Sequence, residues 1–143
     1  MQNSMKLRFR ALSQNESFAR VVAGAFSTQL NPTINELTDI KTAVSEAVTN
    51  AIIHGYSQSD GEVELDVAID TDMITIVVRD FGVGIDDIMR AREPFYTTWP
   101  GDERSGMGFT VMETFMDSVD VESKVGEGTT VTMTKRINMG DNV

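Results

Sequence analysis

Two polar side chains with complementary chemistry stand four residues apart in an otherwise apolar stretch. Glu46 and Asn50 lie within residues 45–55, and on a helix of roughly 3.6 residues per turn this spacing places them about 40° apart on one face. A carboxylate can orient or deprotonate a hydroxyl group, and a neutral carboxamide oxygen can bind Mg²⁺ without removing the positive charge that phosphates need. Such a pair is also common on a solvated helix face, so other segments must decide between the two interpretations.

A second patch suited to a nucleotide begins where an expected strand ends. The carboxylate of Asp80 can accept a hydrogen bond from the exocyclic amine of adenine and would repel the carbonyl oxygen of guanine. An aspartate here also serves as an ordinary turn cap. Gly82 and Gly84 follow it, and glycines let the backbone pass close under a flat base.

Two more patches lie further along the chain. Gly106 and Gly108 precede an expected helix, whose free amide groups and dipole attract phosphate, although glycines before a helix also serve ordinary turns. Thr129 and Thr130 offer hydroxyl groups near a base, directly or through water, although threonine is also a good strand former.

The elements that must position these patches follow from the periodicity of the apolar residues. Alternation predicts strands near residues 5–10, 62–69, 73–80, 119–123 and 129–137. Helical spacing predicts helices near residues 14–30, 34–55 and 109–116, with a short helix over 86–92. This order predicts a two-layer α/β sandwich of the α+β class, with a mostly antiparallel sheet, helices on one face and an edge strand at residues 5–10.

Two helix starts carry the pattern of a capping box, at Ser13 with Glu16 and at Thr33 with Glu36. In the first helix the apolar stripe expected to face the core is Phe18, Val21, Val22, Ala25, Phe26 and Leu30. Arg20 lies off that stripe and is expected to be exposed. In the second helix the expected core stripe, opposite the pair described first, is Leu37, Ile40, Val44, Val48 and Ala51.

Length, charge and composition exclude several classes of protein. The 143 residues are expected to form one domain, 1–143, and the net charge of -10 opposes the phosphates of nucleic acid. The absence of cysteine excludes disulfides and thiolate metal sites, and one histidine argues against structural zinc. No signal region and no apolar run of about eighteen residues occurs, so we expect a soluble cytoplasmic protein that does not bind a membrane.

The connection between residues 81 and 105 is irregular and contains several glycines and prolines. A connection this long inside a compact domain is usually a functional lid or a disordered segment. We expect residues 94–105 to form a lid that is mobile without nucleotide.

In order and in type, these patches resemble the nucleotide-binding motifs of the family that groups gyrase, an ATP-dependent heat-shock chaperone, histidine kinases and the mismatch-repair protein MutL. Residues 46–50 resemble its N box, 80–84 its first glycine box and 104–109 its second, and the resemblance covers nearly the whole chain. Within this family, residues 45–56 and 104–109 are very similar to sporulation anti-sigma factors that are also serine kinases. The resemblance implies a Bergerat-type ATP-binding fold.

The resemblance also implies roles for individual residues. Glu46 would be the catalytic base, Asn50 the magnesium ligand and Asp80 the carboxylate that reads adenine. Thr130, with or without Thr129, would close the base pocket. The other residues that would line the nucleotide are Gly82, Gly84, Ser105, Gly106, Met107 and Gly108. Arg104 would meet the terminal phosphate or the incoming protein substrate, and Arg20 matches a position used against both protein partners.

The implied assembly is a homodimer that holds one sigma factor and uses Mg-ATP to phosphorylate a serine of a small anti-anti-sigma protein. Two alternatives remain open. The first is a nucleotide-gated sigma-binding module without transfer, which would keep every binding residue, so that only Glu46 distinguishes it from the kinase. A histidine-kinase-like catalytic domain needs a separate helical domain with an acceptor histidine. The sequence Asp80-Phe81-Gly82 also spells the magnesium motif of ordinary protein kinases, but the glycine-rich loop, lysine strand and His-Arg-Asp loop of those enzymes are absent.

Overall fold

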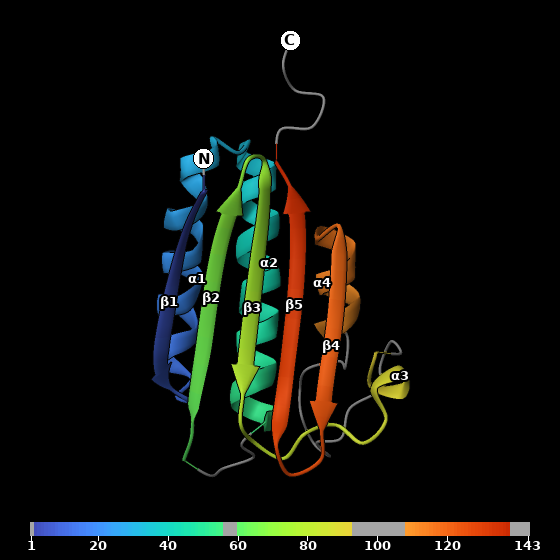
Figure 1. The fold of residues 1–143 in the computed structure, drawn as a ribbon. Coiled ribbons are helices and arrows are strands. Elements are labelled where there is room, and N and C mark those ends of the chain that lie inside the picture. The colour runs from blue at the N-terminus through green and yellow to red at the C-terminus, as the bar shows by residue number, and fades with distance from the viewer. Residues whose placement is uncertain (1, 56–59, 93–107, 138–143) are drawn as a thin grey trace.

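The computed structural model of the chain describes residues 2–55, 60–92 and 108–137 (Figure 1). Its strands are β1 (Gln2–Arg10), β2 (Glu62–Asp70), β3 (Met73–Asp80), β4 (Ser118–Lys124) and β5 (Gly128–Arg136). Its α-helices are α1 (Gln14–Ser27), α2 (Ile34–Asn50), α3 (Ile88–Ala91) and α4 (Gly108–Phe115). A 3-10 turn (Thr28–Leu30) follows α1, and a π-helical turn (Ala51–Gly55) follows α2. This is the element order that the sequence predicts, including the short helix α3.

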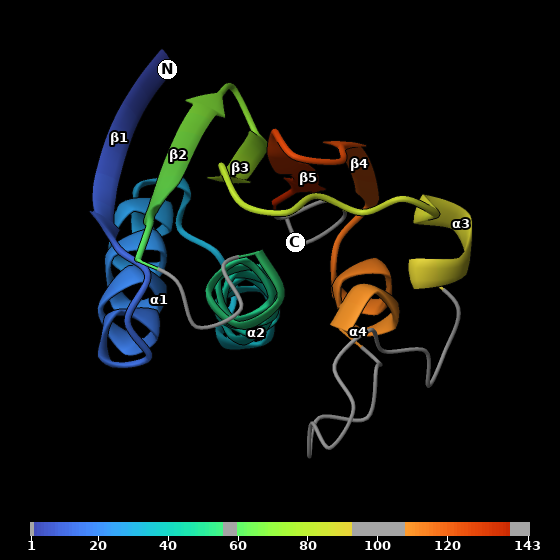
Figure 2. The same cartoon turned by 90° about the horizontal axis from the view of Figure 1, so that it is seen from below.

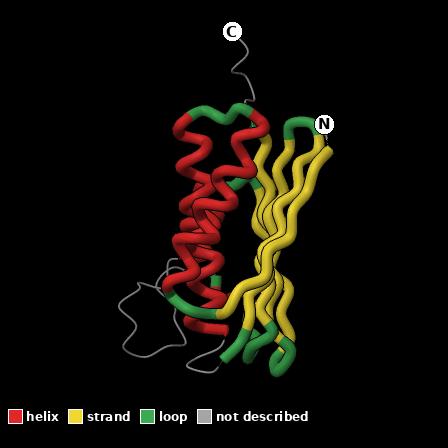
Figure 3. The backbone as a smooth tube through the Cα atoms, turned by 90° about the vertical axis from the view of Figure 1, so that its left-hand side faces the viewer, coloured by secondary structure: helices red, strands yellow, loops and turns green. Residues whose placement is uncertain are grey.

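The five strands form one sheet in the order β1-β2-β3-β5-β4, and every neighbouring pair is antiparallel. Helices α1, α2 and α4 all lie on one face of this sheet, and no described element covers the other face (Figures 1 and 2). The view along the sheet shows the helix layer and the strand layer side by side (Figure 3). The predicted two-layer α+β sandwich is therefore confirmed, as is the placement of β1 at an edge. None of the described helices is long and apolar enough to span a membrane.

The core lies between the sheet and the central helix α2. Alternate residues of β2 and β3 point into it, and Leu65 and Ile76 have no exposed surface. From α2, Ile40, Val44 and Val48 meet them, also fully buried. Three of the five residues expected in the α2 core stripe are therefore fully buried, because the 3.6-residue period places them on the face toward the sheet.

The first helix packs through a face that coincides only in part with the one predicted. Its buried residues are Ala19, Ala23, Gly24 and Ser27. Phe18 and Val21 are instead 51% and 57% exposed. A Cβ atom on Gly24 would lie 3.1 Å from the side chain of Lys41 in α2, so small residues allow the two helices to pack closely. The predicted stripe was wrong at Phe18 and Val21, because close packing selected small side chains over large ones. It was right at Phe26 and Leu30, which are partly buried against the core.

Only one of the two predicted capping boxes forms. At Thr33 the side chain accepts from the Glu36 amide at 3.0 Å, and the Glu36 carboxylate accepts from the Thr33 amide at 2.8 Å. Ser13 has helical backbone angles and makes no side-chain capping bond. Glu16 instead accepts a hydrogen bond from Nε of Arg20 at 3.0 Å. The Arg20 side chain, expected to be an exposed solvated charge, is thus ion-paired and 37% exposed.

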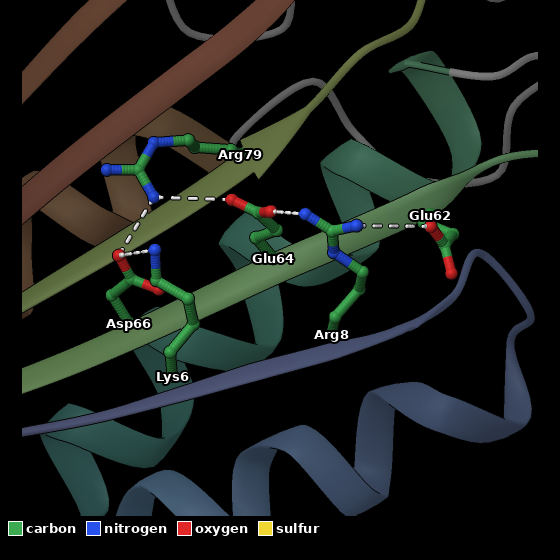
Figure 4. Close-up of polar contacts among 6 residues, drawn as sticks. All are labelled: Lys6, Arg8, Glu62, Glu64, Asp66 and Arg79. Carbon is green, nitrogen blue, oxygen red and sulfur yellow. Dashed lines mark hydrogen bonds and ion pairs between the residues drawn. The ribbon is translucent and has the colours of Figure 1, made fainter.

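The uncovered face of the sheet carries a row of charged side chains on β1, β2 and β3 (Figure 4). This charged ladder consists of Lys6, Arg8, Glu62, Glu64, Asp66 and Arg79. The acidic residues of β2 alternate with its apolar ones and so lie on the face away from the core, but Glu64 is only 7% exposed. It is covered because it lies between two arginines: Arg8 donates to one oxygen, and Nη1 of Arg79 lies 3.5 Å from the other.

Candidate functional site

Several of the residues predicted to bind nucleotide lie at one end of the molecule. The strand β3 ends there at Asp80 and β5 begins there at Gly128. The last turns of α2, which contain Asn50, and the segment that follows β3 reach the same end (Figures 1 and 2). Residues far apart in the sequence are gathered here because antiparallel strands and the helix behind them share this end of the sheet.

Asp80 is a buried carboxylate at the last position of β3. It is 6% exposed and follows Ile76 and Val78 on the side of the sheet that faces the helices. The amide of Gly82 donates to its Oδ1 at 3.0 Å. Burial raises the pKa of Asp80, and hydrogen bonds from the backbone of Gly82 and Thr129 oppose that rise without cancelling it. The residue caps its turn, and its carboxylate lies in an environment where a donor such as an exocyclic amine would be bound strongly.

The register of β3 and β5 distinguishes the two candidate threonines. Thr129 pairs directly with Asp80, and Thr130 pairs with Arg79. Since paired residues share a face of the sheet, Thr129 lies on the helix side beside Asp80 and is 9% exposed. Thr130 lies on the opposite face with the charged ladder. Of the two hydroxyls, the one brought to the buried carboxylate is that of Thr129.

The glycine at position 84 is required by a neighbouring strand. It has φ +78°, and a Cβ atom there would lie 2.3 Å from the carbonyl oxygen of Lys124. The amide of Gly126 donates to the carbonyl of Val83 at 2.8 Å. The glycine segment after Asp80 is therefore fixed against the turn between β4 and β5, and a larger residue at position 84 would push the two apart.

Asn50 and Gly108 touch across the junction of α2 and α4. A Cβ atom on Gly108 would lie 2.7 Å from Nδ2 of Asn50 and 3.1 Å from its Oδ1. The missing side chain of Gly108 thus leaves the space that the carboxamide occupies. A π-helical turn begins directly after Asn50, and such irregular turns are frequent at functional sites. This contact brings Asn50, from the first predicted motif, next to Gly108, from the second glycine motif.

The remaining predicted residues fall into three groups. Glu46 is half-buried on α2, one turn before Asn50 and off the core stripe. Arg20 lies on α1, which packs on the other side of α2 from α4, so it is outside this cluster (Figure 2). Arg104, Ser105, Gly106, Met107 and the expected lid over residues 94–105 lie outside the described residues.

Sequence reasoning missed Ser123, which hydrogen-bonds to residues of this cluster. Its hydroxyl lies 2.8 Å from the Thr129 hydroxyl and accepts from the Ile85 amide at 2.7 Å. The turn signal at residues 126–128 would have paired Ser123 with Thr129 and indicated this contact. Among the described residues, no group of three or more Asp, Glu, His or Cys side chains is arranged to hold a metal ion.

Comparison with known proteins gives a consistent result over nearly the whole chain. Residues 9–135 match the family of histidine kinase-like ATPase domains. The anti-sigma F factor of Priestia megaterium is 59% identical over 139 residues, which cover 96% of this chain and 95% of that protein. The anti-sigma F factor of Clostridium beijerinckii is 55% identical over 138 residues, 96% of each chain.

Solved structures with much lower identity share the fold. The RsbU and RsbW domains of a Mycobacterium tuberculosis protein align with a TM-score of 0.67 at 19% identity, over 94% of this chain and 32% of that one. The nucleotide-free catalytic domain of the histidine kinase ThkA aligns with a TM-score of 0.59 at 15% identity, over 93% of this chain and 96% of that one.

Proposed function

Because the chain belongs to the histidine kinase-like ATPase domains and, within them, to the anti-sigma F factors, we propose that it binds and inhibits a sporulation sigma factor and is also a serine kinase. Its substrate would be a serine of an anti-anti-sigma antagonist, and its phosphate donor Mg-ATP. The observation that carries the proposal is the identity of 55–59% with anti-sigma F factors over nearly the full length of both chains. We also propose a homodimer as the unit that holds the sigma factor.

The geometry at the end of the sheet supports the nucleotide part of this proposal. Asp80 would accept a hydrogen bond from the adenine amine, and the Thr129 hydroxyl beside it would complete the polar contacts of the base. The carboxamide of Asn50, held against the start of α4, would lie toward the phosphates. Magnesium ions would neutralise phosphate oxygens there, and a neutral amide oxygen is a suitable ligand because it leaves that charge intact.

The role of Glu46 decides whether the chain is a kinase or a binding module without transfer. It lies one helical turn before Asn50 on the same side of α2, so its carboxylate would stand near a hydroxyl brought toward the phosphates. Its role would be to accept the proton of the substrate serine as the hydroxyl attacks.

The test measures labelled phosphate transfer from ATP to the antagonist, with sigma-factor binding on native gels measured in parallel. Glu46→Gln keeps the shape of the side chain and removes the base, so transfer should fall by about 10²–10⁴-fold. Binding of nucleotide and of the sigma factor should remain. Glu36→Gln, nearer the start of the same helix, is the matched control and should transfer at the wild-type rate.

Transfer at the wild-type rate in Glu46→Gln would show that another group removes the proton. No transfer in the wild type, with nucleotide and sigma factor still bound, would identify the chain as a nucleotide-gated module. No sigma-factor binding under any nucleotide condition would contradict the proposed function itself.

A further inference from the structure

Ser123 connects two parts of the candidate base pocket that are far apart in the sequence. It lies on β4 directly opposite Thr129 of β5. Its hydroxyl accepts a hydrogen bond from the Ile85 amide at 2.7 Å. The same oxygen lies 3.0 Å from the Gly128 carbonyl and 2.8 Å from the Thr129 hydroxyl.

The number of protons available fixes how these four groups pair. A serine hydroxyl has one proton and two lone pairs. All three partners are satisfied only when Ser123 donates to the Gly128 carbonyl and accepts from both the Ile85 amide and the Thr129 hydroxyl. In that arrangement the Thr129 proton is directed at Ser123, and the free lone pairs of Thr129 remain for groups beside Asp80.

The same hydroxyl also sets the course of the glycine segment. Ile85 follows Gly84, whose close approach to the Lys124 carbonyl leaves no room for a side chain. The bond from the Ile85 amide therefore fixes the segment that begins at Gly82, and the amide of Gly82 in turn donates to Asp80. Ser123 is thus linked indirectly to the Asp80 carboxylate in two ways, through this segment and through Thr129.

We propose that Ser123 is a positioning residue for adenine selectivity: its hydroxyl orients the Thr129 hydroxyl and the backbone beside Asp80 so that the pocket accepts a 6-amino and rejects a 6-oxo purine. The inference rests on the proposed nucleotide site. It assigns no contact between Ser123 and the nucleotide.

The chain contains a matched control on the same pair of strands. Ser118 lies on β4 directly opposite Thr134 of β5, and the two hydroxyls hydrogen-bond to each other. In this second serine–threonine pair Ser118 is exposed and Thr134 is half-buried, and the pair lies at the far end of the strands from Asp80. A general effect of deleting a serine hydroxyl between these strands should appear equally at both positions.

The experiment titrates ADP and inosine diphosphate into the full chain by calorimetry. Ser123→Ala should raise the Kd for ADP about tenfold and that for inosine diphosphate less, so that the selectivity ratio falls. Ser118→Ala should change neither constant. Ser123→Thr retains a hydroxyl and should restore most of the selectivity.

A Ser123→Ala protein with wild-type Kd values and ratio, or an equal loss in Ser118→Ala, would overturn the inference while leaving the nucleotide site in place. Wild-type protein that binds no adenine nucleotide would overturn both. A second measurement needs no variant: the Ile85 amide should be protected from hydrogen exchange in the nucleotide-free wild type, and rapid exchange there would contradict the proposed bond.

Discussion

At the scale of single residues, Asp80 combines a carboxylate group with a buried position, two properties that ordinarily conflict. A carboxylate that is 6% exposed loses hydration, and its raised pKa records that cost. Two backbone amides return part of the lost interaction. The remaining cost is what an incoming hydrogen-bond donor would relieve, so the site is suited to an amine and unsuited to a carbonyl oxygen.

Replacing this carboxylate should therefore change the choice of base. Asp80→Asn offers an amide group that can turn its donor toward a guanine carbonyl, so the preference for ATP over GTP should fall by at least about tenfold. Calorimetric titration of both proteins with both nucleotides measures this ratio. Equal affinity of the wild type for ATP and GTP would show that Asp80 does not read the base.

The same substitution should change the pH dependence of stability. The folded-state pKa of Asp80 lies above its ordinary value of 3.8, so its contribution to stability is present below that value and is lost as the pH rises through the folded pKa. Without nucleotide, Asp80→Asn should therefore gain stability relative to the wild type between about pH 4 and pH 7. Urea unfolding at both pH values measures the difference, and a constant difference would contradict the raised pKa.

Gly108 offers a way to move Asn50 without replacing it. Gly108→Ala places a methyl group where the end of the carboxamide now lies, and that flexible side chain can turn away at little cost. We expect the free energy of unfolding to change by less than about 1 kcal/mol while Mg-ATP binding weakens about tenfold. Thermal unfolding and calorimetry separate the two effects. If Gly108→Ala weakens binding equally in an Asn50→Ala background, the effect does not pass through Asn50.

At the scale of elements, the two helix starts differ in a way that their sequences do not reveal. The box at Thr33 satisfies two backbone amides with side chains, whereas Ser13 makes no such bond. Helix α1 is held by its packing on α2 and by the Glu16–Arg20 pair, so it does not depend on its cap.

Thr33→Ala should consequently cost about 1 kcal/mol of stability, and Ser13→Ala less than about 0.5 kcal/mol. Urea denaturation of both variants measures the comparison, since both remove one hydroxyl from the start of a helix. Equal losses would mean that the Ser13 hydroxyl caps α1 in solution.

At the scale of the whole molecule, the two faces of the sheet are stabilised differently. The helix face is apolar and covered, while the other carries the charged ladder across β1, β2 and β3. Glu64 is buried between two arginines on this face, although Arg8 itself is largely exposed and solvent screens its share of the interaction.

Removing the charge of Glu64 should therefore matter more than removing that of its neighbour. Glu64→Gln should destabilise the fold by about 1–2 kcal/mol. Glu62→Gln should remain within about 0.5 kcal/mol, since that exposed carboxylate lies 3.8 Å from the same arginine. Chemical denaturation at low and high salt is the measurement. A loss at Glu62 as large as that at Glu64 would show that burial does not set the strength of these pairs.

Local patterns in the sequence determined the element order, the core stripe of α2, the capping box at Thr33 and the placement of the binding motifs at element ends. These features depend on the periods of helices and strands, which a residue and its near neighbours set. The choice of Thr129 over Thr130 could also have been predicted from the sequence. Thr129 is an even number of residues from Val131 and Met133, so it lies on the same apolar side of β5.

Only the tertiary structure decided the features that join distant segments. The packing face of α1 depended on how closely α2 approaches, so small residues were buried in place of Phe18 and Val21. The contact of Asn50 with Gly108 and the bond from the Ile85 amide to Ser123 needed the tertiary structure, because each joins segments that are far apart in the sequence. Sequence periodicity specifies which side of an element is apolar, but close packing in three dimensions selects the partner that covers it.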